Sequence, residues 1–311
     1  MRIAVYGAGA VGGYFGGRLA QAGEAVTFIA RGEHLQALQR QGLKVDSLNG
    51  DFTLQPVDAT DDPDRVGPVD VVLVAVKAWQ VSAAAVEMRP LVGSDTLVVP
   101  LLNGVEAPDQ LAEVLGVEHV AGGLCRISSI LAAPGYIRHV GIEPSVVFGE
   151  LDNRPSQRCR SLLAAFEHAG VKAEIPPDIR VAMWEKFLFI AAFGGVGAVT
   201  RAPAGVLRSV PEVRAVLEMA LQEILAVAVA QGVSLPQDSV ARTMKFIDGL
   251  PAGVQASMQR DIIDGKPSEL AAQTGAVVRL GKKMNVQTPA NDFLYACLLP
   301  QELRARGEVS F

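Results

Sequence analysis

Residues 181–190, VAMWEKFLFI, contain a lysine among apolar neighbours. In a helix that advances about 100° per residue, Ile179, Met183 and Ile190 share one stripe with Lys186. A lysine in such surroundings either extends its ammonium group to water or holds it in a pocket, where desolvation lowers its pKa. The second arrangement suits general acid catalysis, because a proton donor works best when its pKa lies near the working pH. Spacing alone leaves both arrangements open.

The glycine-rich segment GAGAVG at residues 7–12 has the spacing of a phosphate-binding turn. It directly follows the strand-like run RIAVY and opens the helix-like run 10–23, which is the setting that this chemistry needs. There the first glycine permits a tight turn, the second lets the backbone approach a pyrophosphate, and the third allows close packing of helix on strand. The alternative is a glycine-rich turn without a ligand. The predicted cofactor contacts are Gly7, Ala8, Gly9, Ala10, Val11 and Gly12.

Further polar residues follow other predicted strands of the same sheet. Arg31 ends the second strand, where an arginine favours the 2′-phosphate of NADP and an acidic residue favours NAD. Glu33 follows two residues later and keeps NAD open as an alternative. Lys77 and Asn103 follow aliphatic runs. Ligands of parallel sheets bind beyond the carboxyl ends of the strands, so these side chains are predicted to line one cleft with the glycine-rich turn.

The composition argues against several other functions. The 28 basic residues are outnumbered by 33 acidic ones, and no basic run is present that would follow a nucleic-acid backbone. The cysteines and histidines are scattered, so they offer neither a disulfide framework nor a metal site. The longest uncharged apolar run, residues 187–199, is shorter than the roughly 20 residues that cross a membrane. We expect a cytoplasmic protein without metal, membrane or nucleic-acid partners.

The order of the predicted elements indicates two domains. Strand-like and helix-like stretches alternate in the first half, and Asn49-Gly50 between two alternating runs predicts a hairpin with a two-residue turn. Beyond Asp178 only helical periodicity remains, at 178–200, 211–231, 236–248, 254–264 and 267–283. We therefore predict an α/β fold, with a Rossmann-like, nucleotide-binding parallel-sheet domain at 1–176 followed by an all-α substrate and catalytic domain at 177–311.

The chain resembles the ketopantoate reductase family over nearly its whole length. The motifs that carry the resemblance occur in the family's order: GAGAVGGYFGGRLA, VAVKAWQ (74–80), LLNGVE (101–106), MWEKFL (183–188), SMQRDI (257–262), KPSEL (266–270) and TPAND (288–292). The resemblance implies a helical domain similar to the C-terminal domain of 6-phosphogluconate dehydrogenase. It also implies NADPH-dependent reduction of the 2-oxo acid 2-dehydropantoate to pantoate, a step of pantothenate biosynthesis.

The same resemblance implies roles for single residues. Lys186 matches the family's general acid, and Asn103 matches an asparagine that contacts both cofactor and substrate. Lys77 matches a lysine on the cofactor side, and Ser257 matches a serine that binds the substrate carboxylate. Glu269 matches a glutamate that serves catalysis and lies at the nicotinamide end of the cofactor. By its position alone, in the first turn of the last predicted helix, Glu269 could equally complement the helix dipole.

Three positions depart from the family pattern. Members that reduce ketopantoate have asparagines four and eight residues after the catalytic lysine and another in the stretch that matches APAG. This chain has Ile190, Gly194 and Ala204 at those positions. A site that hydrogen-bonds its substrate can discriminate by factors on the order of 10⁴, and an apolar site does not. We therefore expect a pocket for a bulkier or less hydroxylated 2-oxo acid or ketone, and a pKa of Lys186 lower than in the asparagine-bearing members.

Three functional hypotheses follow. The protein is a ketopantoate reductase with rearranged polar contacts, or a family reductase for another small 2-oxo acid or ketone, or a protein that binds NADP without turnover. Retention of Lys186 and Glu269 argues against the third. The apolar faces of the helical domain, such as that of residues 216–230, either close a monomer core or form a homodimer contact.

Overall fold

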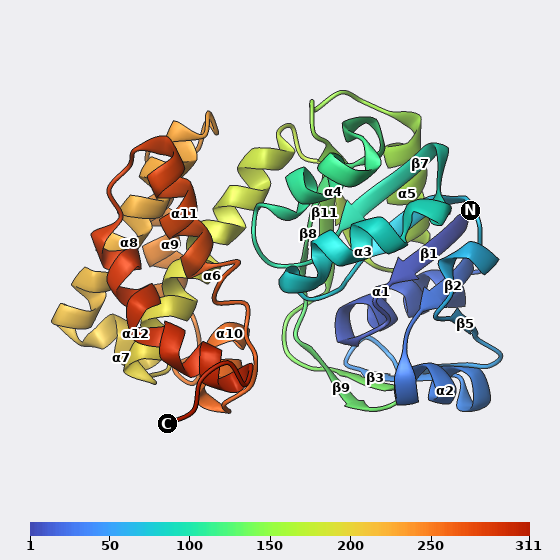
Figure 1. Ribbon diagram of the computed structural model, residues 1–311, viewed down its shortest axis with the longest axis horizontal. Coiled ribbons are helices and arrows are strands. Elements are labelled where there is room, and N and C mark those ends of the chain that lie inside the picture. Colours follow the sequence, from blue (N-terminus) through green and yellow to red (C-terminus); the bar gives the residue numbers. More distant parts are fainter. The chain divides into compact units, whose positions relative to one another are not determined.

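The computed structural model describes all residues, 1–311, and the chain divides into two compact units. The first unit consists of Met1–Leu102 and Glu106–Ile179, and the second of Asn103–Val105 and Arg180–Phe311. All strands belong to the first unit and the second is helical (Figure 1), so the predicted fold class is confirmed. The short segment Asn103–Val105 groups with the helical unit although it closely follows a strand.

A five-stranded parallel sheet with the order β5-β2-β1-β6-β7 forms the centre of the first unit. Tyr6 pairs with both Ile29 and Val74, and Val74 pairs with Pro100, so the carboxyl ends of four strands lie level. The segments that leave these strands therefore start at one edge of the sheet. The strands are β1 (Arg2–Tyr6), β2 (Ala25–Ile29), β5 (Asp58–Thr60), β6 (Val69–Val74) and β7 (Val92–Pro100).

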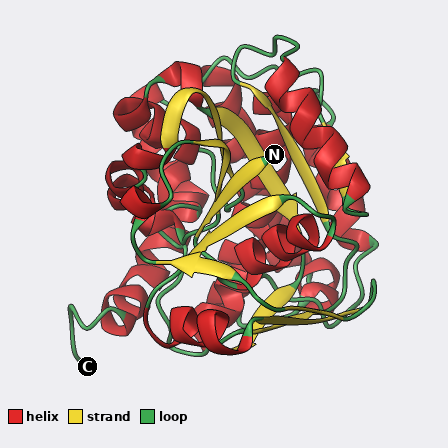
Figure 2. Ribbon diagram, turned by 90° about the vertical axis from the view of Figure 1, so that its right-hand side faces the viewer, coloured by secondary structure: helices red, strands yellow, loops and turns green.

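The central strands are continuous aliphatic runs because helices cover both faces of the sheet (Figure 2). In β6, Val71 and Leu73 join one apolar cluster, whereas Val72 and Val74 join another on the opposite face. Each side chain of this size stabilises the fold by about 1.5–3 kcal/mol when it is fully buried. The helices of this unit are α1 (Ala10–Gln21), α2 (Gly32–Gln41), α3 (Val81–Glu87), α4 (Ala107–Leu115) and α5 (Gln157–His168).

Helix α1 packs against two sheets because glycines line both of its faces. A Cβ atom on Gly16 would lie 2.6 Å from Val5 of the parallel sheet, and one on Gly13 would lie 2.2 Å from Ile137 of a second sheet. The second sheet, of order β4-β3-β10-β9, contains β3 (Leu43–Ser47), β4 (Phe52–Leu54), β9 (Ser129–Ala133) and β10 (Tyr136–His139). A third sheet, of order β12-β11-β8, contains β8 (Ala121–Arg126), β11 (Ser145–Glu150) and β12 (Lys172–Glu174).

The hairpin predicted around Asn49-Gly50 is present, but the two-residue turn is wrong. Strands β3 and β4 pair antiparallel, and residues 48–51 connect them. The Gly50 N–H donates to the carbonyl oxygen of Ser47 at 2.9 Å, and Gly50 has a φ of +96°, which glycine adopts without a steric penalty. The Asp51 carboxylate accepts a hydrogen bond from the Ser47 N–H at 2.7 Å. Because a side chain closes this longer loop, the alternation of apolar residues in the strands does not reveal the length of the loop.

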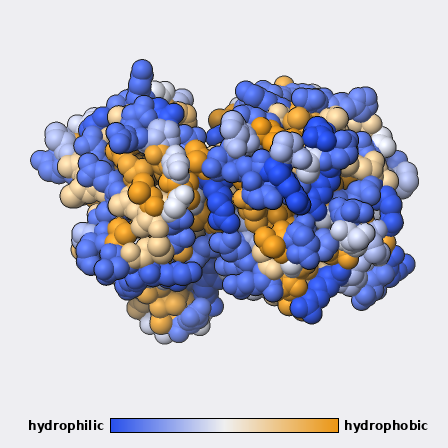
Figure 3. Space-filling view, turned by 90° about the horizontal axis from the view of Figure 1, so that it is seen from above, coloured by the Kyte–Doolittle hydropathy of each residue, from blue (hydrophilic) through white to orange (hydrophobic).

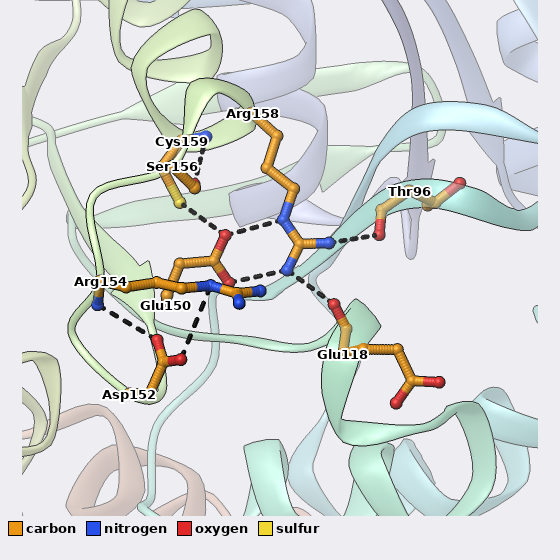
Figure 4. A network of polar contacts seen from close by, with 8 residues as sticks. All are labelled: Thr96, Glu118, Glu150, Asp152, Arg154, Ser156, Arg158 and Cys159. Atoms are coloured by element: carbon orange, nitrogen blue, oxygen red, sulfur yellow. Dashed lines mark hydrogen bonds and ion pairs between the residues drawn. The ribbon is translucent and has the colours of Figure 1, made fainter.

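A buried ion pair ties α5 to two strands of the first unit (Figure 4). The guanidinium of Arg158 donates to both carboxylate oxygens of Glu150 at 2.7 Å, and also to the carbonyl oxygens of Thr96 at 3.3 Å and Glu118 at 2.7 Å. Burial by itself raises the pKa of Glu150. The hydrogen bonds from Arg158 and Ser156 and the charge of Arg158 outweigh that effect, so the pKa lies below its ordinary value.

The second unit is built around α6 (Ile179–Thr200), the helix predicted at 178–200. This helix is long and apolar enough to cross a membrane, but 67% of its most apolar window is buried, as in the core helix of a soluble protein. On the face shown in Figure 3, hydrophilic residues predominate and apolar ones form smaller patches. The other helices are α7 (Ala204–Ser209), α8 (Pro211–Ala230), α9 (Ser239–Asp248), α10 (Ser257–Ile263), α11 (Thr274–Met284) and α12 (Pro289–Ala305).

The sequence analysis missed α7 and α12. Helix α7 is too short to show a period. In α12 the polar Asn291 and Glu302 are buried while Phe293 is 67% exposed, and Pro300 lies inside the helix. The buried face thus mixes these two polar residues with Leu294 and Leu298, so the apolar residues alone do not mark it.

Three predicted helices begin later than expected. Helices α9 and α10 begin at Ser239 and Ser257, and the helix predicted from residue 267 begins only at Thr274. The intervening segment forms turns, which are held because the buried Glu302 accepts hydrogen bonds from the N–H and hydroxyl groups of Ser268. Glu269 is therefore not in the first turn of a helix, and the helix-dipole explanation for this residue is wrong.

Candidate functional site

The glycine-rich turn of the first unit is held by backbone contacts at the edge of the parallel sheet. Gly7 has a φ of +97°, and a Cβ atom there would lie 2.9 Å from the carbonyl group of Ala75. The N–H groups of Gly7 and Ala8 donate to the carbonyl oxygen of Ile29 at 3.1 and 3.3 Å. Glycine at the first position is thus required both by conformation and by the close approach of the segment that follows β6.

The other two glycines of this turn differ in what they face. A Cβ atom on Gly12 would lie 2.1 Å from the carbonyl oxygen of Gly7, so this glycine lets α1 pack on β1. A Cβ atom on Gly9 would meet no atom within 4 Å. The first turn of α1, with Ala10 and Val11, has no acidic residue and no side-chain cap. The protein itself gives no steric reason for glycine at position 9, whereas a pyrophosphate at the helix N-terminus does.

His34 supports the same turn and was not predicted from the sequence. The N–H of Gly135 donates to Nδ1 of His34 at 3.0 Å. Because Nδ1 accepts, the ring hydrogen lies on Nε2, which donates to the carbonyl oxygen of Ala8 at 2.7 Å. The histidine joins the glycine-rich turn to the loop between β9 and β10. A single histidine without a spaced partner offers no sequence signal of such a role.

Arg31 is exposed just beyond β2 and pairs with Glu87 at the end of α3. The same carboxylate accepts a hydrogen bond from the hydroxyl group of Tyr6, the last residue of β1. Burial and then the Glu87 carboxylate raise the pKa of Tyr6, so its hydroxyl remains a donor at neutral pH. Glu33 is exposed in the first turn of α2. The sequence analysis considered Glu33 beside Arg31 but missed Glu87, which comes from a distant part of the chain.

Lys77 follows β6 and is exposed. Its Nζ atom lies 5.8 Å from the centre of the Trp79 ring, within the range of a cation–π contact. Gln80 accepts a hydrogen bond from the Lys77 N–H at 3.1 Å, which fixes the backbone at this position. Gln80 thus holds the backbone of Lys77, and the ring of Trp79 lies near its ammonium group.

In the second unit, Asn103 and Glu269 are in direct contact. Asn103 Nδ2 donates to Glu269 Oε2 at 2.9 Å, although the residues are 166 positions apart in sequence. Glu269 is only 7% exposed. Gly104 has a φ of +108°, and a Cβ atom there would lie 3.2 Å from the carbonyl oxygen of Ala272. The glycine of LLNGVE thus allows the asparagine to pack closely on the segment that carries Glu269.

Lys186 is half-buried on α6, between the buried Met183 and the half-buried Ile190. The lysine is thus neither fully enclosed nor on an open surface. Gly194 and Ala204 are buried, so the second and third departures from the family pattern concern interior positions. A Cβ atom on Gly194 would lie within 3.0 Å of Met258 and 3.6 Å of Ala256.

Ser257, which lies between Ala256 and Met258 in the sequence, is exposed at the start of α10. The space next to Gly194 is thus bounded by the residues on either side of the predicted carboxylate-binding serine.

Comparison with known proteins shows the family to which the chain belongs. The family described as ketopantoate reductase PanE/ApbA matches residues 3–153, and the corresponding C-terminal family matches residues 178–302. The chain belongs to the ketopantoate reductase family. The 2-dehydropantoate 2-reductase of Nostoc sp. is 30% identical over 299 residues, which cover 94% of this chain and 93% of that protein. The uncharacterized oxidoreductase YkpB of Bacillus subtilis is 32% identical over 300 residues, which cover 96% and 98%.

Solved structures share the complete architecture. A PanE/ApbA family ketopantoate reductase from Ralstonia eutropha has a TM-score of 0.89 and 35% identity, with coverage of 98% of this chain and 100% of that chain. A D-mandelate dehydrogenase solved with NADH and anilino(oxo)acetate has the same TM-score at 24% identity, which shows a shared fold, with coverage of 98% and 99%. This ketopantoate reductase family member is an oxidoreductase that interconverts C=O and CH–OH groups with a nicotinamide cofactor.

Proposed function

We propose that the protein reduces 2-dehydropantoate to pantoate with NADPH, and that Lys186 is the general acid. The observation that carries this proposal is the contact of Asn103 with the buried Glu269, in the same helical unit as the half-buried Lys186. Asn103, Glu269 and Lys186 are the polar residues that the sequence resemblance predicts at the reacting centre. A protein that only binds a nucleotide would not need a buried carboxylate held in this way.

When bound, the reduced nicotinamide supplies a hydride to the ketone carbon. Lys186 donates a proton from Nζ to the ketone oxygen, which becomes the hydroxyl group of the product. Glu269 accepts a hydrogen bond from the side-chain amide of Asn103 and thereby fixes the orientation of the carboxamide. Asn103 Oδ1 is then oriented to accept a hydrogen bond from a ribose or substrate hydroxyl. The Ser257 hydroxyl donates to the substrate carboxylate.

The cofactor proposal distinguishes NADPH from NADH. The backbone of residues 7–12 binds the pyrophosphate, and Arg31 and Lys77 supply positive charge, with Arg31 at the 2′-phosphate. The open space over Gly9 and the uncapped start of α1 support the pyrophosphate contact. Glu87 and Glu33 weaken the positive potential around Arg31, so we propose a preference for NADPH that is smaller than an arginine without carboxylate neighbours would give.

A second candidate substrate is a less polar 2-oxo acid or ketone. Relative to the family pattern, Ile190, Gly194 and Ala204 remove three side-chain amides, and Ala204 is fully buried. The D-mandelate dehydrogenase that was solved with NADH and anilino(oxo)acetate uses the same fold. The fold itself is therefore compatible with either substrate.

We also propose that the protein works in the reducing cytoplasm. Its three cysteines are free thiols, and Cys125 and Cys159 are buried. The exposed apolar side chains Met219, Phe246 and Phe293 of the helical unit support a homodimer contact through this unit. Light scattering of the purified protein over a range of concentrations tests the dimer.

The function is tested by following NADPH consumption with 2-dehydropantoate and with 2-oxo acids of graded polarity. A preference for 2-dehydropantoate supports the main proposal, whereas activity only with apolar acids supports the second candidate. Lys186→Ala should abolish turnover and leave NADPH binding intact. The exposed Lys245 on α9 provides a matched control, because Lys245→Ala removes a lysine from the same unit without touching the proposed site. Equal activity of both variants would contradict the role of Lys186.

A further inference from the structure

Three glycines of α6 each face a buried polar side chain. A Cβ atom on Gly197 would lie 2.6 Å from Gln259 Oε1, and one on Gly195 would lie 3.1 Å from the hydroxyl of Thr274. A Cβ atom on Gly194 would lie 3.5 Å from Gln273 Oε1. The glycines therefore make room for polar groups against a helix that is otherwise apolar.

The two glutamines differ in their hydrogen bonds. Gln259 is fully buried and satisfied, because its Nε2 donates to the carbonyl oxygen of Ala202 at 2.9 Å and its Oε1 accepts from the N–H of Ala256 at 3.3 Å. Gln273 is 2% exposed, yet its carboxamide makes no hydrogen bond with the protein. Its polar atoms are not among the unpaired ones that are completely sealed off from solvent. Leaving a buried amide without a hydrogen bond costs free energy, and a bound ligand can supply the missing partner.

The surroundings of this carboxamide are those of the proposed substrate site. The Gln273 N–H donates to the carbonyl oxygen of Glu269 at 3.0 Å, so the glutamine lies one turn beyond the buried carboxylate. On its other side, the Cβ position of Gly194 contacts Met258, the residue after Ser257. Gln273 is thus close both to the residue whose carboxylate orients Asn103 and to the segment that carries Ser257.

We propose that Gln273 is a substrate-binding residue that selects 2-oxo acids carrying a hydroxyl group. Its Oε1 atom, directed toward the space at Gly194, accepts a hydrogen bond from the substrate hydroxyl, and Nε2 is able to donate to a carboxylate or ketone oxygen. The glycine at position 194 leaves room for this amide to reach the substrate. This inference rests on the proposed reduction of a 2-oxo acid, and it favours 2-dehydropantoate, which has a hydroxyl group, over apolar acids.

The test compares Gln273→Leu with the unaltered protein on a matched pair of substrates. These are 2-dehydropantoate and its deoxy analogue 3,3-dimethyl-2-oxobutanoate, which lacks only the hydroxyl group. We expect kcat/KM for the hydroxylated acid to fall about 10- to 100-fold, since a polar site loses its discrimination when the hydrogen-bonding group is removed. For the deoxy acid we expect a change of less than about threefold, because no hydrogen bond is lost. NADPH affinity and thermal unfolding should stay unchanged.

Two further variants separate substrate contact from a structural effect. Thr274→Val removes a neighbouring buried hydroxyl that also lacks a partner, and it should leave the preference between the two acids unchanged. Adding Gly194→Asn to Gln273→Leu restores an amide from α6, where the nearest obstacle is the flexible end of Met258, and it should recover part of the preference.

Equal loss on both acids, or no loss, would overturn the role of Gln273 while leaving the proposed reduction intact. If the unaltered protein reduces neither acid nor any other 2-oxo acid, the proposed function and this inference both fail.

Discussion

The ion pair of Arg31 with Glu87 makes cofactor preference a sensitive test of the first unit. Replacing Glu87 by glutamine removes the charge that competes with a 2′-phosphate for Arg31, while an amide oxygen remains to accept the hydrogen bond from Tyr6. We expect NADPH to bind more tightly to this variant. NADH has no 2′-phosphate, so its affinity should change much less.

The size of the effect follows from the exposure of the pair. The side chains of Arg31 and Glu87 are 65% and 43% exposed, so water screens much of their attraction. Exposed pairs of this kind contribute about 0.2–1 kcal/mol, which corresponds to roughly a 1.4- to 5-fold gain in NADPH affinity. The gain should shrink as salt is added, because screening acts over about 10 Å at 0.1 M ionic strength.

Titration of nicotinamide fluorescence gives the dissociation constants of NADPH and NADH for each variant. Arg31→Ala should act in the opposite direction and reduce the preference for NADPH. Glu113→Gln removes an exposed carboxylate from α4 and controls for net charge. A loss of NADPH affinity in Glu87→Gln, or an equal change for both cofactors, would refute the competition between carboxylate and phosphate.

Three other outcomes are expected. Gly9→Ala should leave the stability of the protein unchanged, since the new Cβ atom meets no other atom and the backbone is extended. The same variant should weaken cofactor binding at least about tenfold in the fluorescence titration. Gly12→Ala should instead lower the melting temperature, because its Cβ atom would collide with the carbonyl oxygen of Gly7. Lys186→Ala should reduce kcat by a factor of about 10²–10⁴ in the reductase assay, and an unchanged kcat would exclude it as the proton donor. Glu150→Gln should lower the free energy of unfolding in urea by about 3 kcal/mol at neutral pH, because it leaves the partly buried Arg158 without its carboxylate. The pKa of Glu150 is below its ordinary 4.5, so this stabilisation is complete above that pH and disappears as pH falls through the lower folded value; a difference that is constant with pH would contradict the account.

Several parts of the fold were accessible from the sequence because their causes are local. The run RIAVY, the glycines that follow it and the helix at 10–21 form one unit whose period, turn and packing needs are all written within about 20 residues. The continuous aliphatic runs predicted strands buried on both faces, and β6 and β7 occupy that place. The helix predicted at 178–200 also follows from local sequence, and α6 spans Ile179–Thr200.

Other features depended on tertiary contacts that no local pattern encodes. The start of α11 was misplaced because Glu302, far along the chain, holds Ser268 in a turn. Helix α12 was missed because its buried positions are partly polar and make contacts with other helices, as when Asn291 Nδ2 donates to Glu223 at 2.7 Å.

The same distinction applies to the candidate site. The sequence by itself determined the residue types at the edge of the sheet and the lysine on α6, since strand ends and helical spacing follow from short-range chemistry. The contact of Asn103 with Glu269, the ion pair of Glu87 with Arg31 and the unpaired carboxamide of Gln273 beside Gly194 were decided only by the tertiary structure. Each joins residues far apart in the chain, and their proximity depends on how whole elements pack rather than on any spacing in the sequence.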